Sequence, residues 1–133
     1  MKLFKNTSAT LVLVAFSFFT NAAHCLELKQ QTLEEKVALS ELVFIGKIKK
    51  IIKNTQDFGY DLAIVEPIET LKGTPAKDIR ITFNGTIPEA QPNCCKTRES
   101  YLFFVSKNPK GDYYPVNDRY GVYPLSDDMK YKK

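Results

Sequence analysis

The sequence predicts an all-β protein with one short N-terminal helix, in which five strands close into a small barrel. Apolar residues alternate along several segments that are separated by turn signals. The longest of these segments carries a glycine, Gly46, at its centre. About 110 residues remain once a predicted leader is removed, which is enough for one domain with a modest core.

The leader has the features of a secretory signal peptide. Two lysines near the start precede an apolar run over residues 11–19, and small residues follow it. We expect residues 1–23 to be removed, with cleavage after Ala22 or Ala23. The apolar run is about half of the roughly 20 residues that a membrane-spanning helix needs, so we expect no stable membrane anchor. The sequence therefore predicts a secreted or periplasmic protein, with a domain over residues 24–126 and a polar tail over residues 127–133.

The charge balance gives no sign of a polyanionic partner. The chain has 19 basic and 15 acidic residues, and loss of Lys2 and Lys5 leaves 17 basic residues and a net charge of +2. We therefore expect no nucleic-acid binding. The first strand carries a group of lysines, which we interpret as solvated charges that protect a strand edge: Lys47, Lys49, Lys50 and Lys53.

Three cysteines follow the leader, and an oxidising compartment favours a disulfide between two of them. The expected bond joins Cys25 to Cys95 or to Cys94. It would close a loop of about 70 residues and stabilise the fold by roughly 4 kcal/mol. A bond between the adjacent Cys94 and Cys95 is a further alternative, with a strained ring. The remaining thiol is either buried or free to form a covalent dimer.

Residues 40–52 are expected to form the strand around which the barrel is built. Apolar side chains alternate between its two faces, and Gly46 predicts a bend, a bulge or a close backbone approach. A strand bent in this way can contribute to both halves of a closed barrel. The alternation slips near Lys49 and Lys50, which also predicts a bulge.

A short helix is expected before this strand. Thr32 and Glu35 have the spacing of a capping box, which predicts a helix over Leu33–Leu39. Leu33 and Val37 lie on one face of this helix, so we expect that face to pack over the barrel.

Four further strands are predicted, over residues 60–71, 79–83, 101–106 and 113–116, with a last extended segment over residues 120–125. Pro67 cannot donate to a strand ladder, so we expect the second strand to lie at an edge or to be broken there. The fourth strand is almost wholly apolar, so both of its faces should be covered. An immunoglobulin-like sandwich is the alternative fold, but it favours about seven strands and a central tryptophan, and the chain has no tryptophan.

Four pieces of the sequence resemble netrin-like domains, the fold shared with tissue inhibitors of metalloproteinases, and in particular their bacterial secreted relatives. Ser-Glu-Leu-Val-Phe-Ile-Gly-Lys-Ile at residues 40–48 is similar to their first strand, and Leu-Lys-Gly at residues 71–73 to the turn after their second. Cys95 followed by Tyr-Leu-Phe-Phe at residues 101–104 resembles their cysteine and fourth strand, and Cys25 lies where they place an N-terminal cysteine.

This resemblance implies a five-stranded OB-fold barrel and a protein-binding function, with protease inhibition as one candidate activity. The vertebrate inhibitors chelate the protease zinc through the free amino group of an N-terminal cysteine. In this chain that mechanism would need cleavage directly before Cys25. The chain has Glu27 where those inhibitors have the second cysteine of a Cys-x-Cys start.

Nothing in the sequence predicts an enzyme, a cofactor or a metal site. The single histidine, His24, lies near the expected new terminus, and no phosphate-binding loop is present. The alternative function is a small metal- or redox-handling protein that uses His24, Cys25, Cys94 and Cys95. For protein binding, tyrosines near the C-terminus are the candidate face, because amphipathic rings are common at interfaces: Tyr113, Tyr114, Tyr120 and Tyr123.

Overall fold

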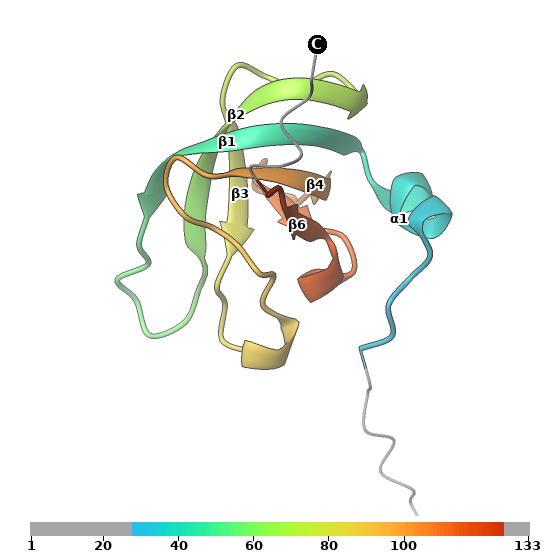
Figure 1. Cartoon of the computed structure of the whole chain (residues 1–133). Coiled ribbons are helices and arrows are strands. Elements are labelled where there is room, and N and C mark those ends of the chain that lie inside the picture. Colours follow the sequence, from blue (N-terminus) through green and yellow to red (C-terminus); the bar gives the residue numbers. More distant parts are fainter. Residues whose placement is uncertain (1–27, 127–133) are drawn as a thin grey trace, which may run out of the picture.

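The computed structural model describes residues 28–126, which contain one α-helix, six strands and two 3₁₀ turns (Figure 1). The predicted leader and the predicted C-terminal tail lie outside the described residues. In chain order the elements are α1 (Leu33–Leu39), β1 (Leu42–Ile52), β2 (Asp61–Lys72), β3 (Ile79–Phe83), η1 (Pro88–Ala90), β4 (Ser100–Lys107), β5 (Tyr113–Pro115), η2 (Asp118–Tyr120) and β6 (Val122–Pro124).

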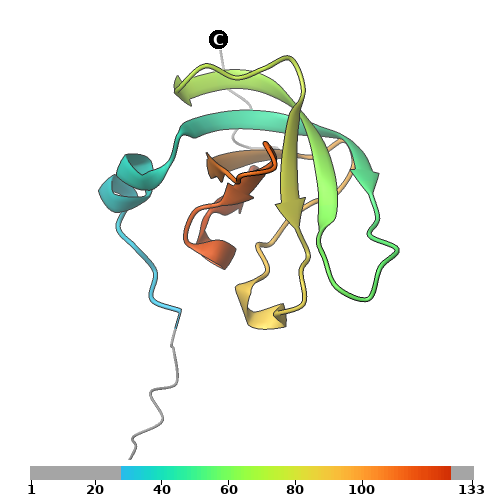
Figure 2. The same cartoon turned by 180° about the vertical axis from the view of Figure 1, so that it is seen from behind.

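The first five strands close into a barrel, which confirms the predicted all-β, OB-fold-like class (Figure 2). The sheet runs in the order β1-β2-β3-β5-β4, and β1 also pairs with β4, which closes the ring. All of these pairings are antiparallel except that between β3 and β5. The short strand β6 pairs with Tyr101–Phe103 of β4, on the edge of β4 opposite β1.

Strand β1 serves both halves of the barrel, as predicted from its glycine. Gly46 is paired with Pro67 of β2 on one side and with Tyr101 of β4 on the other. A Cβ atom at Gly46 would lie 2.5 Å from Val65 Cγ1 and 2.6 Å from Phe44 Cε2, so only glycine fits this approach. The ladder between β1 and β2 also skips Lys49, which confirms the bulge expected there.

The inward side chains of the strands form one continuous core. At its centre the rings of Phe44 and Phe103 stack with their centroids 5.0 Å apart. Strand β3 shows the predicted alternation, with Ile79, Ile81 and Phe83 buried.

Strand β2 is an open edge over its second half. It pairs with β3 only through Asp61–Val65, so Pro67 and the strand residues after it form ladder pairs with β1 alone. Of the two alternatives predicted from Pro67, the structure shows the edge position, because the strand continues through Pro67 to Lys72. Ile68 and Leu71 have no partner in the ladder with β1, and both side chains are exposed.

A second, smaller cluster lies on the outer face of β4, so both faces of that strand are covered as predicted. Val43, Phe104 and Val116 form it, with Leu102 and Tyr123 packed against it. Helix α1 lies beside this cluster and has the predicted bounds and capping box.

The prediction of which helix face packs on the barrel was wrong. Leu33 and Val37 are 58% and 37% exposed, whereas Lys36 is 2% exposed and Ser40 is also buried. The aliphatic stem of a lysine can cover apolar surface while its ammonium reaches acceptors beyond it. Here the ammonium finds acceptors and aromatic faces on the barrel, which the apolar pattern of the helix could not reveal.

Candidate functional site

The four tyrosines predicted as a binding face are divided between packing and surface positions. Tyr113 is partly buried against the main core, and Lys107 lies over its ring at 5.4 Å. Tyr123 packs edge-on against Phe104, with ring centroids 6.0 Å apart. Tyr114 is exposed. Tyr120 lies in η2 and is half-buried. A single binding face formed by all four remains a prediction.

Cys94 and Cys95 lie side by side in the segment between η1 and β4, partly buried against the main core. Their sulfur atoms contact each other in the structure. His24 and Cys25 lie outside the described residues, so the predicted bond from Cys25 stays a prediction. Within residues 28–126 no group of three or more metal-ligating side chains comes together.

A small cavity of about 190 Å³ lies beside the two cysteines and is also lined by Lys96, Glu99 and Tyr101. The Tyr101 hydroxyl donates to Glu99 Oε2 at 2.9 Å and accepts from the Lys96 amide at 3.0 Å. Burial raises the pKa of Tyr101, and the Glu99 carboxylate adds to this effect. Pockets for cofactors or drug-sized ligands usually exceed roughly 300 Å³, so this cavity fits only a small group.

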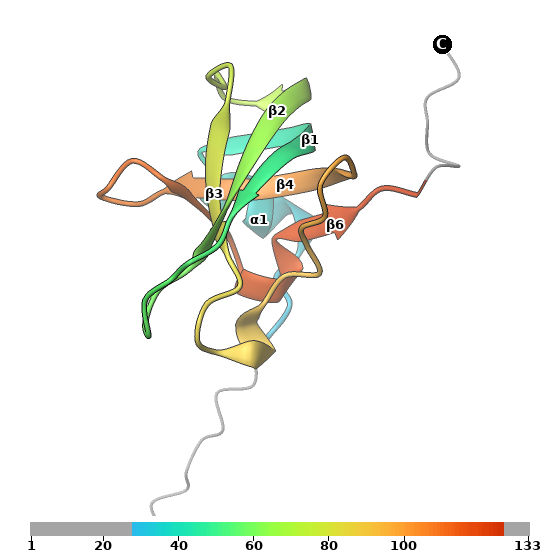
Figure 3. The same cartoon turned by 90° about the vertical axis from the view of Figure 1, so that its left-hand side faces the viewer.

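The most exposed apolar residue of the described chain lies on the loop between β1 and β2. Phe58 is 82% exposed, and Tyr60 on the same loop is 62% exposed. Ile87, on the loop after β3, is 61% exposed. Both loops project from the same end of the barrel (Figure 3). We call Phe58, Tyr60 and Ile87 the loop-end surface.

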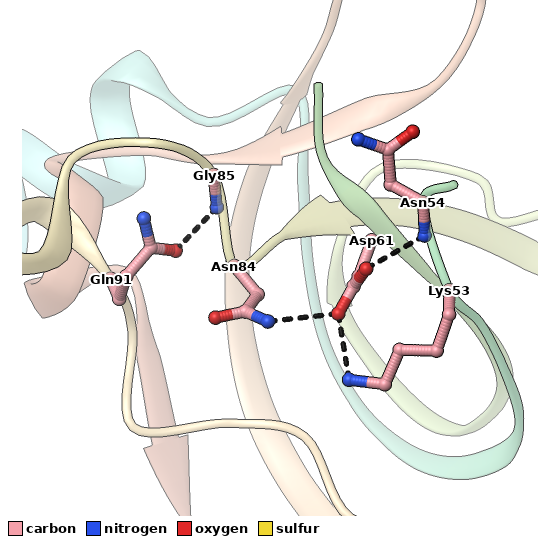
Figure 4. A network of polar contacts seen from close by, with 6 residues as sticks. All are labelled: Lys53, Asn54, Asp61, Asn84, Gly85 and Gln91. Carbon is pink, nitrogen blue, oxygen red and sulfur yellow. Dashed lines mark hydrogen bonds and ion pairs between the residues drawn. The ribbon is translucent and has the colours of Figure 1, made fainter. Parts of the chain in front are cut away.

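A buried carboxylate ties these two loops together (Figure 4). Asp61, at the start of β2, accepts from Lys53 Nζ and from Asn84 Nδ2 through Oδ2, each at 2.8 Å. Its Oδ1 accepts from the Asn54 amide at 2.8 Å. Lys53 and Asn54 belong to the first loop and Asn84 to the second, so one side chain fixes both.

The second loop is held further by Gln91. Its Oε1 accepts from the Gly85 amide and its Nε2 donates to the Ile87 carbonyl, both at 2.8 Å. The ring of Tyr60 lies against Gly85, where a Cβ atom would collide with it. The loop-end surface is therefore held by hydrogen bonds and by direct contact between the loops.

The charge on Asp61 is stabilised by its partners. Burial alone would raise the pKa of this carboxyl, but the hydrogen bonds from Lys53, Asn54 and Asn84 together outweigh it and lower the pKa to about 2. Asp61 therefore remains ionised at any pH above about 3. This matters for the loops because only the carboxylate can accept all three hydrogen bonds.

The lysines of the first strand are partly neutralised. Lys49 lies 2.9 Å from Asp78, whose hydrogen bond raises the pKa of that lysine, and Lys53 lies 2.8 Å from Asp61. Of the four lysines predicted as one group, Lys49 in β1 and Lys53 in the loop after it thus have acidic partners.

Sequence reasoning missed the loop-end surface. The signal available was Phe-Gly-Tyr at residues 58–60, two aromatic residues in a stretch otherwise rich in polar turn formers. Loops have no periodic pattern that predicts exposure, and Asp61 and Asn84 are 23 positions apart.

Comparisons with known proteins leave the family open: no protein-family model matches the chain, and no curated protein matches it either. Among the described residues, no helix has the length and apolar character required to span a bilayer.

Proposed function

We propose that this chain is an exported, non-enzymatic domain that binds a protein partner through the loop-end surface. The observation that carries the proposal is the exposure of Phe58, Tyr60 and Ile87 on two loops that the buried Asp61 holds in place. Exposed aromatic side chains on pre-organised loops are typical anchors of protein interfaces, because little conformational entropy is lost on binding. The signal-peptide pattern supports export to the periplasm or outside the cell.

The netrin-like resemblance supports the same class of function, since it implies protein interaction. Protease inhibition is the narrower candidate within that class. Its chelating form requires that the exported protein begin at Cys25. N-terminal sequencing of the exported protein tests it, and a chain that begins at His24 or earlier would exclude that mechanism.

Site-specific photocrosslinking tests the binding surface. A photoreactive phenylalanine analogue at position 87 should give a discrete crosslinked product when the exported chain is irradiated in its source cells. The product should be lost when Phe58→Ala is added. The control places the analogue at Leu71, which is also exposed but lies in β2. Crosslinking at position 71 with none at position 87 would contradict the proposal.

The adjacent cysteines beside a cavity favour one second candidate, a metal- or redox-handling role that uses His24, Cys25, Cys94 and Cys95. Metal analysis of the purified protein distinguishes the two functions. Stoichiometric zinc or copper that is lost in Cys95→Ser would support the second candidate. Its absence, together with an intact loop-end crosslink, would support protein binding.

A further inference from the structure

The side chain of Lys36 is buried without a carboxylate partner in the described chain. It is 2% exposed, and none of the ion pairs found among residues 28–126 includes it. Lysine is almost never fully buried unless its charge is paired. Neutral groups must therefore stabilise this ammonium.

Those neutral groups form a defined site. Lys36 Nζ donates to the main-chain carbonyl of Tyr120 at 3.2 Å and to the hydroxyl of Tyr123. It also lies 4.6 Å from the ring centroid of Tyr123 and 5.5 Å from that of Phe104. Acceptor oxygens with an aromatic ring beside them are groups that recognise a primary ammonium ion.

The site and its occupant belong to different parts of the fold. Phe104, Tyr120 and Tyr123 come from β4, η2 and β6, which are parts of the barrel or packed on it. Lys36 comes from α1, which lies to the side of the barrel as a separate element (Figures 1 and 2). The barrel thus provides a receptor for an amine, and the helix supplies the amine.

Beyond Lys36, hydrogen bonds rather than apolar packing attach α1 and the residues before it to the barrel. At seven residues it is too short to be stable alone, and Leu33 and Leu39 are exposed rather than packed on the barrel. Hydrogen bonds hold it as well: Lys72 Nζ and Ser106 Oγ each donate at 2.7 Å to the carbonyls of Val37 and Leu39. Just before the helix, the Gln31 amide donates to Asn117 Oδ1 at 2.8 Å, and Asn117 Nδ2 donates to the Lys29 carbonyl at 3.0 Å. Lys36 is therefore the only side chain of α1 itself that is buried.

We propose that Phe104, Tyr123 and the Tyr120 carbonyl form a binding site for a primary alkylammonium group, which Lys36 occupies in the free protein. A lysine side chain of a partner protein takes the place of Lys36 when α1 lifts from the barrel. This site is separate from the loop-end surface and does not depend on the function proposed for it. Its geometry favours a primary amine, because the two oxygens need N–H donors that a quaternary ammonium lacks.

Replacement of the amine by a small molecule tests the site. Lys36→Ala removes Cγ, Cδ, Cε and Nζ, and n-propylammonium supplies the same atoms. We expect the variant to exchange the amide hydrogens of α1 about tenfold faster or more, while the amides of β1 and β3 keep their protection. Added n-propylammonium chloride should restore the protection of α1, whereas equal concentrations of sodium chloride or 1-propanol should not.

A second variant keeps the test decisive if Lys36→Ala fails to fold. Lys36→Met retains an apolar stem but has no ammonium, so α1 should exchange as fast in this variant as in Lys36→Ala. If the amides of α1 were as well protected in Lys36→Met as in the wild type, the proposal would be overturned, because packing of the aliphatic stem would then explain the burial. Restoration by 1-propanol as effective as by n-propylammonium would overturn it too.

The partner's side chain is tested with the full-length Lys36→Ala protein and blocked tripeptides. Ac-Ala-Lys-Ala-amide should shift the NMR signals of the Phe104 and Tyr123 rings in a saturable way. Ac-Ala-norleucine-Ala-amide has a side chain of similar length without the charge and should not. Equal shifts with both peptides would mean that the site does not recognise an amine.

Discussion

At the scale of single residues, Asp61 shows how one buried charge can organise a surface. It is buried and ionised, and its three hydrogen-bond donors come from the two loops that carry Phe58, Tyr60 and Ile87. Removal of a buried acceptor leaves its donors unsatisfied, which costs more than the net value of each bond. The stability of the fold and the order of the loop-end surface should therefore both depend on this carboxylate.

We predict that Asp61→Asn lowers the free energy of unfolding at neutral pH by about 2 kcal/mol, as expected for a pKa lowered from 3.8 to about 2. Because the folded pKa lies below the unfolded one, the stabilisation is complete above about pH 4 and is lost as pH falls through about 2. Urea unfolding at pH 6 and near pH 2.5 should show the difference between variant and wild type shrinking at the lower pH.

Asp57→Asn is the control for this prediction, because Asp57 is exposed on the same loop and should have little effect at either pH. If Asp61→Asn lowered the free energy of unfolding by the same amount at pH 6 and at pH 2.5, the charge of Asp61 would contribute nothing to stability.

Gly46 is the second residue whose identity is dictated by its surroundings. We predict that Gly46→Ala destabilises the barrel by about 1–3 kcal/mol, because the new methyl group would overlap Val65 and Phe44, both fully buried. Chemical denaturation measures the loss. Adding Val65→Ala removes one of the two overlaps, so the double variant should be more stable than the sum of the single losses implies. Simple additivity would show that overlap with Val65 is not the source of the loss.

At the scale of elements, local sequence patterns predicted the features of helices and strands that depend on neighbouring residues. The bounds of α1 and β3, the bulge in β1 and the edge position of β2 all follow from signals within about ten residues: a capping box, strict alternation, a phase slip and Pro67. The buried face of α1 was not predictable in this way, because Lys36 is held by Tyr120 and Tyr123, which are more than 80 positions away.

The N-cap of α1 gives an element-scale prediction. Thr32 accepts from the Glu35 amide while the Glu35 carboxylate accepts from the Thr32 amide. Thr32→Ala should weaken the helix by about 1 kcal/mol, which corresponds to a roughly fivefold increase in amide exchange within α1. Because Lys36 is the one buried residue of α1, the free energy of global unfolding should change much less. An equal fall in global stability would show that helix and barrel unfold together.

At the scale of the whole molecule, the barrel depends on one weak seam. The parallel contact between β3 and β5 consists of a single ladder pair, Ile81 with Tyr113, yet it completes the ring. Two side-chain contacts reinforce it: Thr82 Oγ1 donates to the Tyr113 carbonyl at 3.2 Å, and Arg80 Nε lies 2.7 Å from Asp112 Oδ1. This closure joins distant parts of the chain, so no local pattern in the sequence could have located it.

The seam gives the last prediction. Arg80 is exposed and Asp112 is partly buried. Removal of either by Arg80→Ala or Asp112→Ala should cost about 0.5–1 kcal/mol, as for other surface ion pairs. The amides of β5 should exchange faster in both variants, while those of β1 and β2 should not, because local opening begins where pairing is shortest. A double-mutant cycle should give a positive coupling energy that falls at 1 M salt. Zero coupling would mean that the main-chain and threonine contacts alone close the barrel.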